Sequence, residues 1–325
     1  MQNRSLIALI ALLSLSLGWN LGQRRSEPVP VRQELLREMR ANQQFLDECM
    51  ANMVNQFTPG YRSCAIFSRL EDGRSRLNCS QGEVFKTGCP TEMALNGQGF
   101  FVLEKAGETF YTRDGRFSFR EGKLSSLSGC VLKGYAVRTT GERVNQELQT
   151  ITLGMDPMTK LYGGRYTGFH LDDAGMLYGE ATMTDPVTGQ QTTTNTPLFQ
   201  VAVATFVRPE NLKRGLEPTL FTATRESGQP QWSWAGQPGS GMLCPGSLEL
   251  SNVDFIEQAH VIQALKTYAG LLYDGANHAT SSFAMAKFQS ELHKPMMNPA
   301  PMNPALPTSI GILGNGGKLP NLMSR

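Results

Sequence analysis

Apolar side chains recur at helical spacing near the start of the chain. Between residues 32 and 57 their intervals alternate between four and three, which aligns them as one stripe on a helix. The stripe consists of Leu35, Met39, Leu46, Cys49 and Met53, with the polar Asn42 among them. Asn42 either fixes the register of a coiled coil or faces solvent. We therefore predict a helix over 32–57, after a linker at 24–31, and expect Pro59 and Gly60 to prevent its continuation.

A second stripe lies near the other end of the chain. It repeats at intervals of four, three and four residues and consists of Val261, Leu265, Tyr268 and Leu272. Ser251 and Asn252 are both good N-cap residues, and Asp254 would then complement the helix dipole in the first turn. This predicts a C-terminal helix within 249–294. Residues 295–325 are rich in Pro, Asn, Gly and Met with few charges, which predicts a disordered tail.

The residues between the two helices have the pattern of β-strands. Short runs rich in aromatic and β-branched residues are separated by turn residues from 58 to 248. Asp114 and Gly115 give a hairpin signal, as does the turn at 172–175, whereas 222–246 has the composition of a loop or an edge. The predicted strands include 100–103, 109–112, 116–119, 150–153, 168–171, 176–179 and 199–206. The predicted fold class is thus a mainly β body flanked by N- and C-terminal α-helices that pair as a coiled coil, because neither stripe can bury itself.

The net charge indicates which partners the protein has, and residues 1–23 indicate whether it is exported. Charged residues make up 18% of the 325-residue chain and the net charge is +2, so electrostatics gives no reason to expect nucleic-acid binding. Residues 5–23 carry no charge, and an apolar run covers 6–17. Such a segment suits a cleaved signal peptide and a retained inner-membrane anchor equally well. Either interpretation of 1–23 exports the rest of the chain.

The six cysteines do not have the spacing of a metal site. None forms a C-x-x-C pair, and no histidine stands at zinc-finger spacing. In an oxidising compartment an even number predicts disulfides, and four cysteines are close enough in sequence to bridge loops of the β body. These are Cys64, Cys79, Cys89 and Cys130. The alternative is that several remain as free, buried thiols.

The glycine-rich stretch around Gly97 and Gly99 raises the question of nucleotide binding. A phosphate-binding G-x-G-x-x-G precedes a helix, whose N-terminus supplies amide donors. Here a predicted strand follows, so we interpret these glycines as turn residues. Trp232 and Trp234 could stack on a sugar but are more typical of an ordinary strand face. We find no catalytic triad or metal-ligand pattern, and we predict no enzyme activity, cofactor or small-molecule substrate.

Four motifs resemble a known family. They are the N-terminal segment ending in T-P-G-Y-R, the G-x-G-F-F-V stretch, Y-T-R-D-G and S-N-V-D. In this order they are similar to the signatures of the bacterial flagellar basal-body rod and hook proteins, and most similar to the distal rod proteins. The matching residues are Asn55, Thr58, Pro59, Gly60, Tyr61, Gly97, Gly99, Phe100, Tyr111, Thr112, Arg113, Asp114, Gly115, Ser251, Asn252, Val253 and Asp254.

The resemblance implies a structural subunit of the flagellar basal body, within the periplasm or cell envelope. It would polymerise through its terminal helices, with copies of itself and other rod or hook proteins as partners. This chain differs from the family in its apolar N-terminus, its six cysteines and its additional C-terminal residues. These differences keep a second hypothesis open, in which the protein is a membrane-tethered, non-polymerising adaptor of the envelope.

Overall fold

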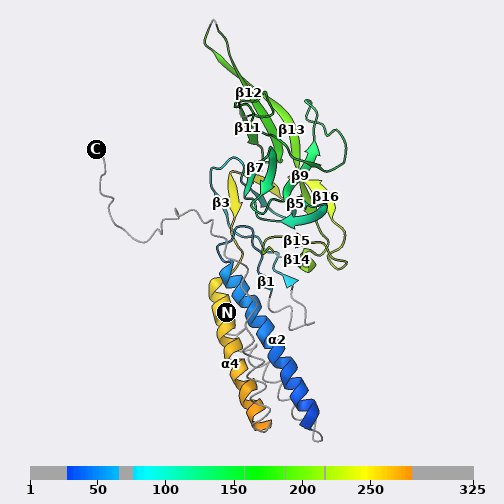
Figure 1. The fold of residues 1–325 in the computed structure, drawn as a ribbon, viewed down its shortest axis with the longest axis vertical. Coiled ribbons are helices and arrows are strands. Elements are labelled where there is room, and N and C mark those ends of the chain that lie inside the picture. The colour runs from blue at the N-terminus through cyan, green and yellow to red at the C-terminus, as the bar shows by residue number, and fades with distance from the viewer. Residues whose placement is uncertain (1–27, 66–75, 157, 187, 216, 280–325) are drawn as a thin grey trace, which may run out of the picture. The chain divides into compact units, whose positions relative to one another are not determined.

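Two helices and a β body make up the computed structural model, which describes residues 28–65, 76–156, 158–186, 188–215 and 217–279. Helix α2 (Pro28–Val54) and helix α4 (Phe255–Ala279) lie side by side (Figure 1). No helix among the described residues is long and apolar enough to cross a membrane. The predicted signal or anchor at 1–23 and the predicted tail at 295–325 lie outside the described residues.

Both helices begin at positions other than those predicted. Helix α2 starts at Pro28, inside the predicted linker at 24–31, because proline is well tolerated in the first turn of a helix. Helix α4 starts at Phe255 rather than at Ser251 or Asn252. Asp254 is the N-cap: its Oδ1 accepts the Glu257 N–H at 3.0 Å, and its carbonyl accepts the Gln258 N–H at 3.0 Å.

A 12-stranded sheet dominates the body, and its strands follow the path β11-β12-β13-β9-β5-β6-β15-β14. Strand β13 is its longest and pairs with β12, β16, β9 and β5. Three two-stranded pairs, β1-β2, β17-β4 and β18-β3, complete the body. The strands are β1 (Cys64–Ala65), β2 (Arg76–Leu77), β3 (Val84–Lys86), β4 (Met93–Asn96), β5 (Phe100–Lys105), β6 (Glu108–Thr112), β7 (Phe117–Arg120), β8 (Lys123–Ser126), β9 (Val131–Ala136), β10 (Gln149–Thr150), β11 (Gly168–Leu171), β12 (Met176–Thr184), β13 (Gln191–Thr205), β14 (Lys213–Arg214), β15 (Phe221–Thr222), β16 (Gln231–Trp234), β17 (Met242–Pro245) and β18 (Ser247–Glu249), with a 3-10 turn η1 (Pro209–Asn211).

Both faces are buried in β5 and in the C-terminal part of β13, residues 200–204. Phe101 and Val203 belong to one hydrophobic cluster, whereas Phe100 and Ala202 belong to a second. Alternate side chains along a strand point to opposite faces. Burial on both faces therefore explains why the sequence of β13 ends in a nearly continuous apolar run.

Asp114 and Gly115 do not form the predicted hairpin turn. Strand β6 pairs with β5 and β15, whereas β7 pairs with β8. The chain therefore passes at this point from one set of paired strands to another. Asp114 Oδ1 instead accepts the Arg116 N–H at 3.1 Å, as in an Asx turn. A Cβ on Gly115 would lie 1.5 Å from the Met93 carbonyl oxygen. The glycine is thus required for close backbone approach rather than for a hairpin.

All six cysteines are free thiols in the structure, so the disulfides that we expected are not formed in it. Several have a polar neighbour within hydrogen-bonding range instead. Arg214 Nη2 lies 3.8 Å from Cys64 Sγ, Thr91 Oγ1 lies 3.4 Å from Cys89 Sγ, and Ser128 Oγ lies 3.5 Å from Cys130 Sγ. The alternative interpretation, several free and buried thiols, fits Cys49 and Cys130, which are both free and buried in the structure.

Candidate assembly site

The predicted helix stripes face each other across an apolar seam. Most of the predicted positions are buried, and Leu46 and Met53 are partly buried against the same cluster. The pattern missed two members of this seam, Phe45 and Ile262. Those predicted and buried are Leu35, Met39, Cys49, Val261, Leu265, Tyr268 and Leu272.

Three polar contacts cross the seam and fix how the helices are aligned. Asn42 is buried, and its Nδ2 donates to the Leu265 carbonyl at 3.2 Å. Tyr268 donates from its hydroxyl to Glu38 Oε2 at 3.4 Å, and Asn52 Nδ2 donates to Gln258 Oε1 at 3.0 Å. Residue numbers rise along one helix as they fall along the other, so the pair is antiparallel. Asn42 therefore faces the seam rather than solvent and ties the two helices together at one register.

The T-P-G-Y-R motif connects the end of α2 to the body. Thr58 Oγ1 donates to Asn55 Oδ1 at 3.1 Å, which closes the turn before Pro59. Gly60 has a φ of +69°, and a Cβ there would lie 2.2 Å from the Asp114 N atom. Only glycine meets both conditions without strain. The motif therefore lets this turn pack directly against the Y-T-R-D-G segment.

Tyr61 and Asn52 extend this connection through side chains. The Tyr61 hydroxyl donates to Asn52 Oδ1 at 3.1 Å, and the same oxygen accepts the Cys64 N–H at 2.9 Å. Burial raises the pKa of Tyr61 to about 12. Arg214, on β14, has its guanidinium carbon 4.4 Å from the Tyr61 ring centroid and donates to the Arg62 carbonyl. The turn after α2 is thus held by Asn52 of the helix and by Arg214 of the body.

Arg113 explains the glycine-rich stretch. Its Nη1 donates to the carbonyls of Gly97 and Gly99, each at 2.8 Å, and its Nη2 donates to the Leu95 carbonyl at 2.5 Å. Both glycines have positive φ, +114° and +116°. The G-x-G turn therefore does enclose a charged group, but the group is the guanidinium of the Y-T-R-D-G motif and not a phosphate.

Glu249 is the acidic centre of the site. Its Oε2 lies 2.7 Å from Arg113 Nε, and its Oε1 lies 2.8 Å from Arg62 Nη2 and accepts the Gly82 N–H at 2.9 Å. All three charged side chains are at most 4% exposed. Burial, together with the nearby Arg113 charge, lowers the pKa of Arg62 to about 10. Two guanidiniums share one carboxylate, so each depends on Glu249 for its counter-charge.

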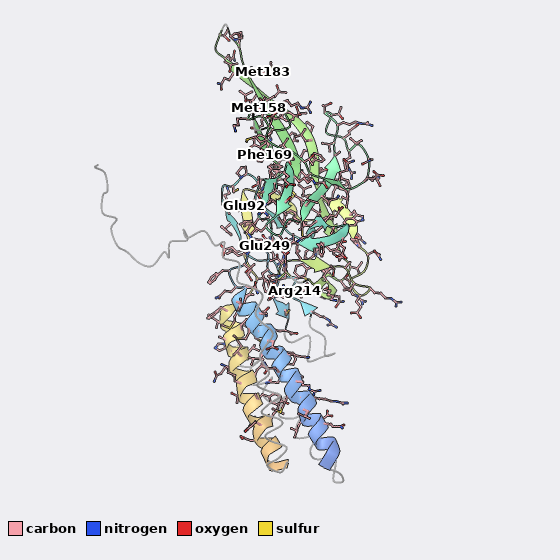
Figure 2. The ribbon with its side chains drawn as sticks, in the orientation of Figure 1. Glu92, Met158, Phe169, Met183, Arg214 and Glu249 are labelled. Atoms are coloured by element: carbon pink, nitrogen blue, oxygen red, sulfur yellow. The ribbon has the colours of Figure 1, made fainter. Side chains whose placement is uncertain are left out.

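The S-N-V-D motif joins the same site from the C-terminal side. Asn252 Oδ1 accepts the Ser63 N–H at 2.7 Å, and its Nδ2 donates to the carbonyls of Asn78 and Ser80, each at 2.8 Å. Ser251 Oγ accepts the Val253 N–H at 3.4 Å. Figure 2 labels Glu249 and Arg214, which both lie where the body meets the helix pair. We call this set the junction cluster: Asn52, Tyr61, Arg62, Arg113, Glu249, Asn252 and Gln258.

The structure thus brings together residues from all four motifs. Phe100 and Tyr111 are exceptions, because they lie in the second hydrophobic cluster of the body. Thr112 Oγ1 donates to the Thr219 carbonyl at 2.8 Å, which ties the Y-T-R-D-G segment to residue 219. Sequence reasoning missed Glu249 and Gln258, whose side chains carry no motif signal. Their positions beside S-N-V-D were the only available hint.

The part of the chain that the structure describes contains no recognisable metal-binding site. No group of three or more His, Cys, Asp or Glu side chains there could hold an ion. His170 Nδ1 lies 2.6 Å from Glu180 Oε1 at the sheet edge. A catalytic triad needs a nucleophile beside such a pair, and among the described residues the His170 ring is stacked on Tyr178 instead.

Comparison with known proteins agrees with the motifs. Residues 94–161 match the model of the flagellar hook protein FlgE/F/G D1 domain. The chain is 32% identical over 131 residues to the flagellar basal-body rod protein FlgF of Caulobacter vibrioides, covering 34% of this chain and 52% of the relative. It is 27% identical over 192 residues to the rod protein FlgG of Buchnera aphidicola, covering 58% and 61%.

A further rod protein, FlgF of Mesorhizobium japonicum, is 31% identical over 98 residues, or 26% of this chain and 41% of the relative. The chain thus spans about two-fifths to three-fifths of the length of these relatives. The matched D1 segment contains the G-x-G and Y-T-R-D-G motifs, which meet at Arg113. Over these segments the chain is similar to the flagellar rod and hook proteins, as its four motifs indicated.

Proposed function

We propose that this protein is a non-catalytic structural subunit of the flagellar basal-body rod, or of a rod-like assembly in the cell envelope. In this proposal copies join through the terminal helices, which form a coiled coil. The observation that carries the proposal is the junction cluster. Residues from three of the four motifs there fasten a helix pair to a β body through buried ion pairs and hydrogen bonds.

A rigid connection of this kind suits a subunit that must hold its place in a polymer. The relatives are named as rod proteins of the flagellar basal body, which supports a location in the cell envelope and a role in motility. Other rod or hook proteins are then the expected partners, together with copies of this chain. The comparisons give no support to the tethered adaptor, so it is not proposed.

Contacts between copies would use the outer faces of the helices, because the seam is already filled within one chain. Large apolar side chains are exposed on these faces. Val54 is 61% exposed and Ile256 is 63% exposed, and they stand at the junction end of α2 and α4. Among the described residues of the two helices, the exposed large apolar side chains are Met50, Val54, Phe255, Ile256 and Leu271, and Phe57 is exposed in the turn after α2. Exposed apolar side chains that gather into a patch are typical of protein–protein contact surfaces.

The test replaces two of these exposed side chains, Val54 and Ile256, with charged ones. The full-length chain with Val54→Asp and Ile256→Asp should remain folded but lose self-association and incorporation into basal bodies. Sedimentation and co-purification with basal bodies are the measurements. A matched control changes two exposed polar positions on the same helices, Gln44→Asp and Gln263→Asp, and should assemble normally.

A second pair of substitutions tests the seam itself. Charges at Leu46 and Leu265 should abolish assembly while the β body keeps its circular dichroism spectrum. Assembly that persists in both double variants would overturn the proposal that the helices polymerise the chain.

A further inference from the structure

We infer that a cleft on the β body binds an extended segment of a partner protein that carries a single Glu or Asp side chain. The cleft lies between the segment 141–146 and residues of β12, β13 and β16, and it has a volume of about 520 Å³. This volume is within the range of about 300–1,000 Å³ typical of ligand sites. Its lining includes Glu142, Arg143, Gln146, Gln200 and Trp234. None of these belongs to the junction cluster, so this inference goes beyond the proposed assembly function.

Arg143 is the group that selects for an acidic ligand. Its guanidinium carbon lies 3.5 Å from the Trp234 ring centroid and 5.3 Å from that of Tyr135. Stacking on two aromatic rings fixes the position of the head group and leaves its N–H donors available. Among the described residues, Arg143 makes no hydrogen bond or ion pair through these donors. A carboxylate is the partner that matches this planar fork with two parallel hydrogen bonds.

Gln200 adds an acceptor on the floor of the cleft. Its side chain is 7% exposed, and its Nε2 donates to the Ala174 carbonyl at 3.3 Å. That bond fixes the orientation of the amide, while Oε1 receives no donor from the described residues. Such an oxygen can accept a backbone N–H. A ligand that offers an N–H next to a carboxylate therefore fits both groups.

Glu142 and Gln146 narrow the class of ligand. Both side chains are exposed at the rim, and the Glu142 carboxylate would repel a ligand of high negative charge. It can instead accept further N–H donors. A nucleic acid or a polyphosphate is disfavoured by this carboxylate. An extended peptide with a single Glu or Asp meets all of these conditions, because its backbone supplies the donors and its side chain the carboxylate.

The experiment titrates the full-length protein with two blocked pentapeptides, Ser-Thr-Glu-Thr-Ser and the same peptide with Gln in place of Glu. Calorimetry gives the affinity, and ¹⁹F NMR of fluorotryptophan-labelled protein shows whether the Trp234 signal moves. We expect the Glu peptide to bind at least about tenfold more tightly than the Gln peptide. Its affinity should fall with increasing salt, as for any partly exposed charge pair.

Two variants assign the effect to the cleft. Arg143→Gln should weaken binding of the Glu peptide by about tenfold or more. Arg165→Gln is the matched control: its guanidinium also stacks on a ring, 4.7 Å from the Tyr166 centroid, but it does not line the cleft. That control should bind as the unmodified chain does. Arg143→Gln should also leave assembly through the helices unchanged, so failure of this inference and failure of the proposed function are distinguishable.

Several outcomes would overturn the inference. One is equal affinity for the two peptides, and another is no binding of the Glu peptide at millimolar concentration. A third is that the Arg143→Gln variant binds the Glu peptide as tightly as the unmodified chain while the ¹⁹F signal of a tryptophan other than Trp234 shifts. Glutarate, tested as a free small carboxylate, should bind at least about tenfold more weakly than the Glu peptide. Equal binding of glutarate would assign the cleft to a small molecule instead. The comparison between ligands needs no variant, so a misfolded Arg143→Gln protein would not leave the question open.

Discussion

The seam of the helix pair and the junction cluster are adjacent but are built from different side chains. The seam consists of Phe45, Cys49, Val261, Ile262 and Leu265, which bury apolar surface. The junction cluster instead buries two guanidiniums, one carboxylate and several amides. Apolar packing tolerates small changes of shape, because its contacts are non-directional. A buried charge network tolerates the loss of no member, since each remaining charge would lack its partner.

This difference indicates a division of roles. The seam holds two helices together with three polar contacts to set their alignment. The junction cluster determines how that pair is attached to the body, because hydrogen bonds and ion pairs are directional. The following predictions test the division, in order of decreasing expected effect.

The largest effect is expected from Glu249→Gln. This change leaves Arg62 and Arg113 buried without a counter-charge, and we expect a loss of about 3–5 kcal/mol in unfolding free energy. Hydrogen exchange should rise in the body and in both helices, because the cluster joins them. The control is Glu34→Gln, which breaks an exposed pair with Arg37 and should cost at most about 1 kcal/mol. Equal effects of the two substitutions would contradict the role given to Glu249.

Leu265→Ala should have the next largest effect and should act more locally. Leu265 is 4% exposed in the seam, and its truncation leaves a cavity that costs about 2–4 kcal/mol. Hydrogen exchange should increase in α2 and α4 while the β13 core of the body remains protected. If the body loses protection to the same extent as the helices, the seam and the junction cluster do not have separate roles.

The smallest of the three effects is a dependence on pH. Burial first, and the Glu48 carboxylate second, raises the pKa of the Cys49 thiol from 9.0 to about 12. Between these values the unfolded chain loses this proton while the folded chain keeps it, so stability falls as pH rises. At pH 10.5 the expected loss relative to pH 8 is about 2 kcal/mol from this group.

Denaturant unfolding of the chain and of Cys49→Ala at both pH values measures this difference. Tyr61 and Tyr268 also have raised pKa values and contribute to the same alkaline loss in both proteins. Only the difference between the two proteins reports on Cys49. An identical pH dependence would mean that Cys49 is not buried in the seam.

The helix–β–helix order and the strands β5, β6, β7, β11, β12 and the end of β13 could be predicted from the sequence, because their signals are local. Short strands such as β1, β2 and β14 carry no such signal and were missed. A stripe at intervals of three and four, or a run of aromatic and β-branched residues, reflects burial on one element. The same reasoning was wrong at Asp114 and Gly115, where a hairpin signal marks a crossing between strands. It was also wrong at Ser251 and Asn252, because Asp254 is the N-cap and Asn252 bonds across to residue 63 and to Ser80.

The sequence by itself therefore determined the helix–β–helix order and the more apolar strands, and its motifs indicated the resemblance to rod and hook proteins. Only the tertiary structure decided what those motifs do. Gly60 meets Asp114, Arg113 fills the turn of Gly97 and Gly99, and Glu249 neutralises two arginines from distant segments. The physical reason is range: periodicity records contacts between each element and the core, whereas a buried ion pair joins residues more than one hundred positions apart.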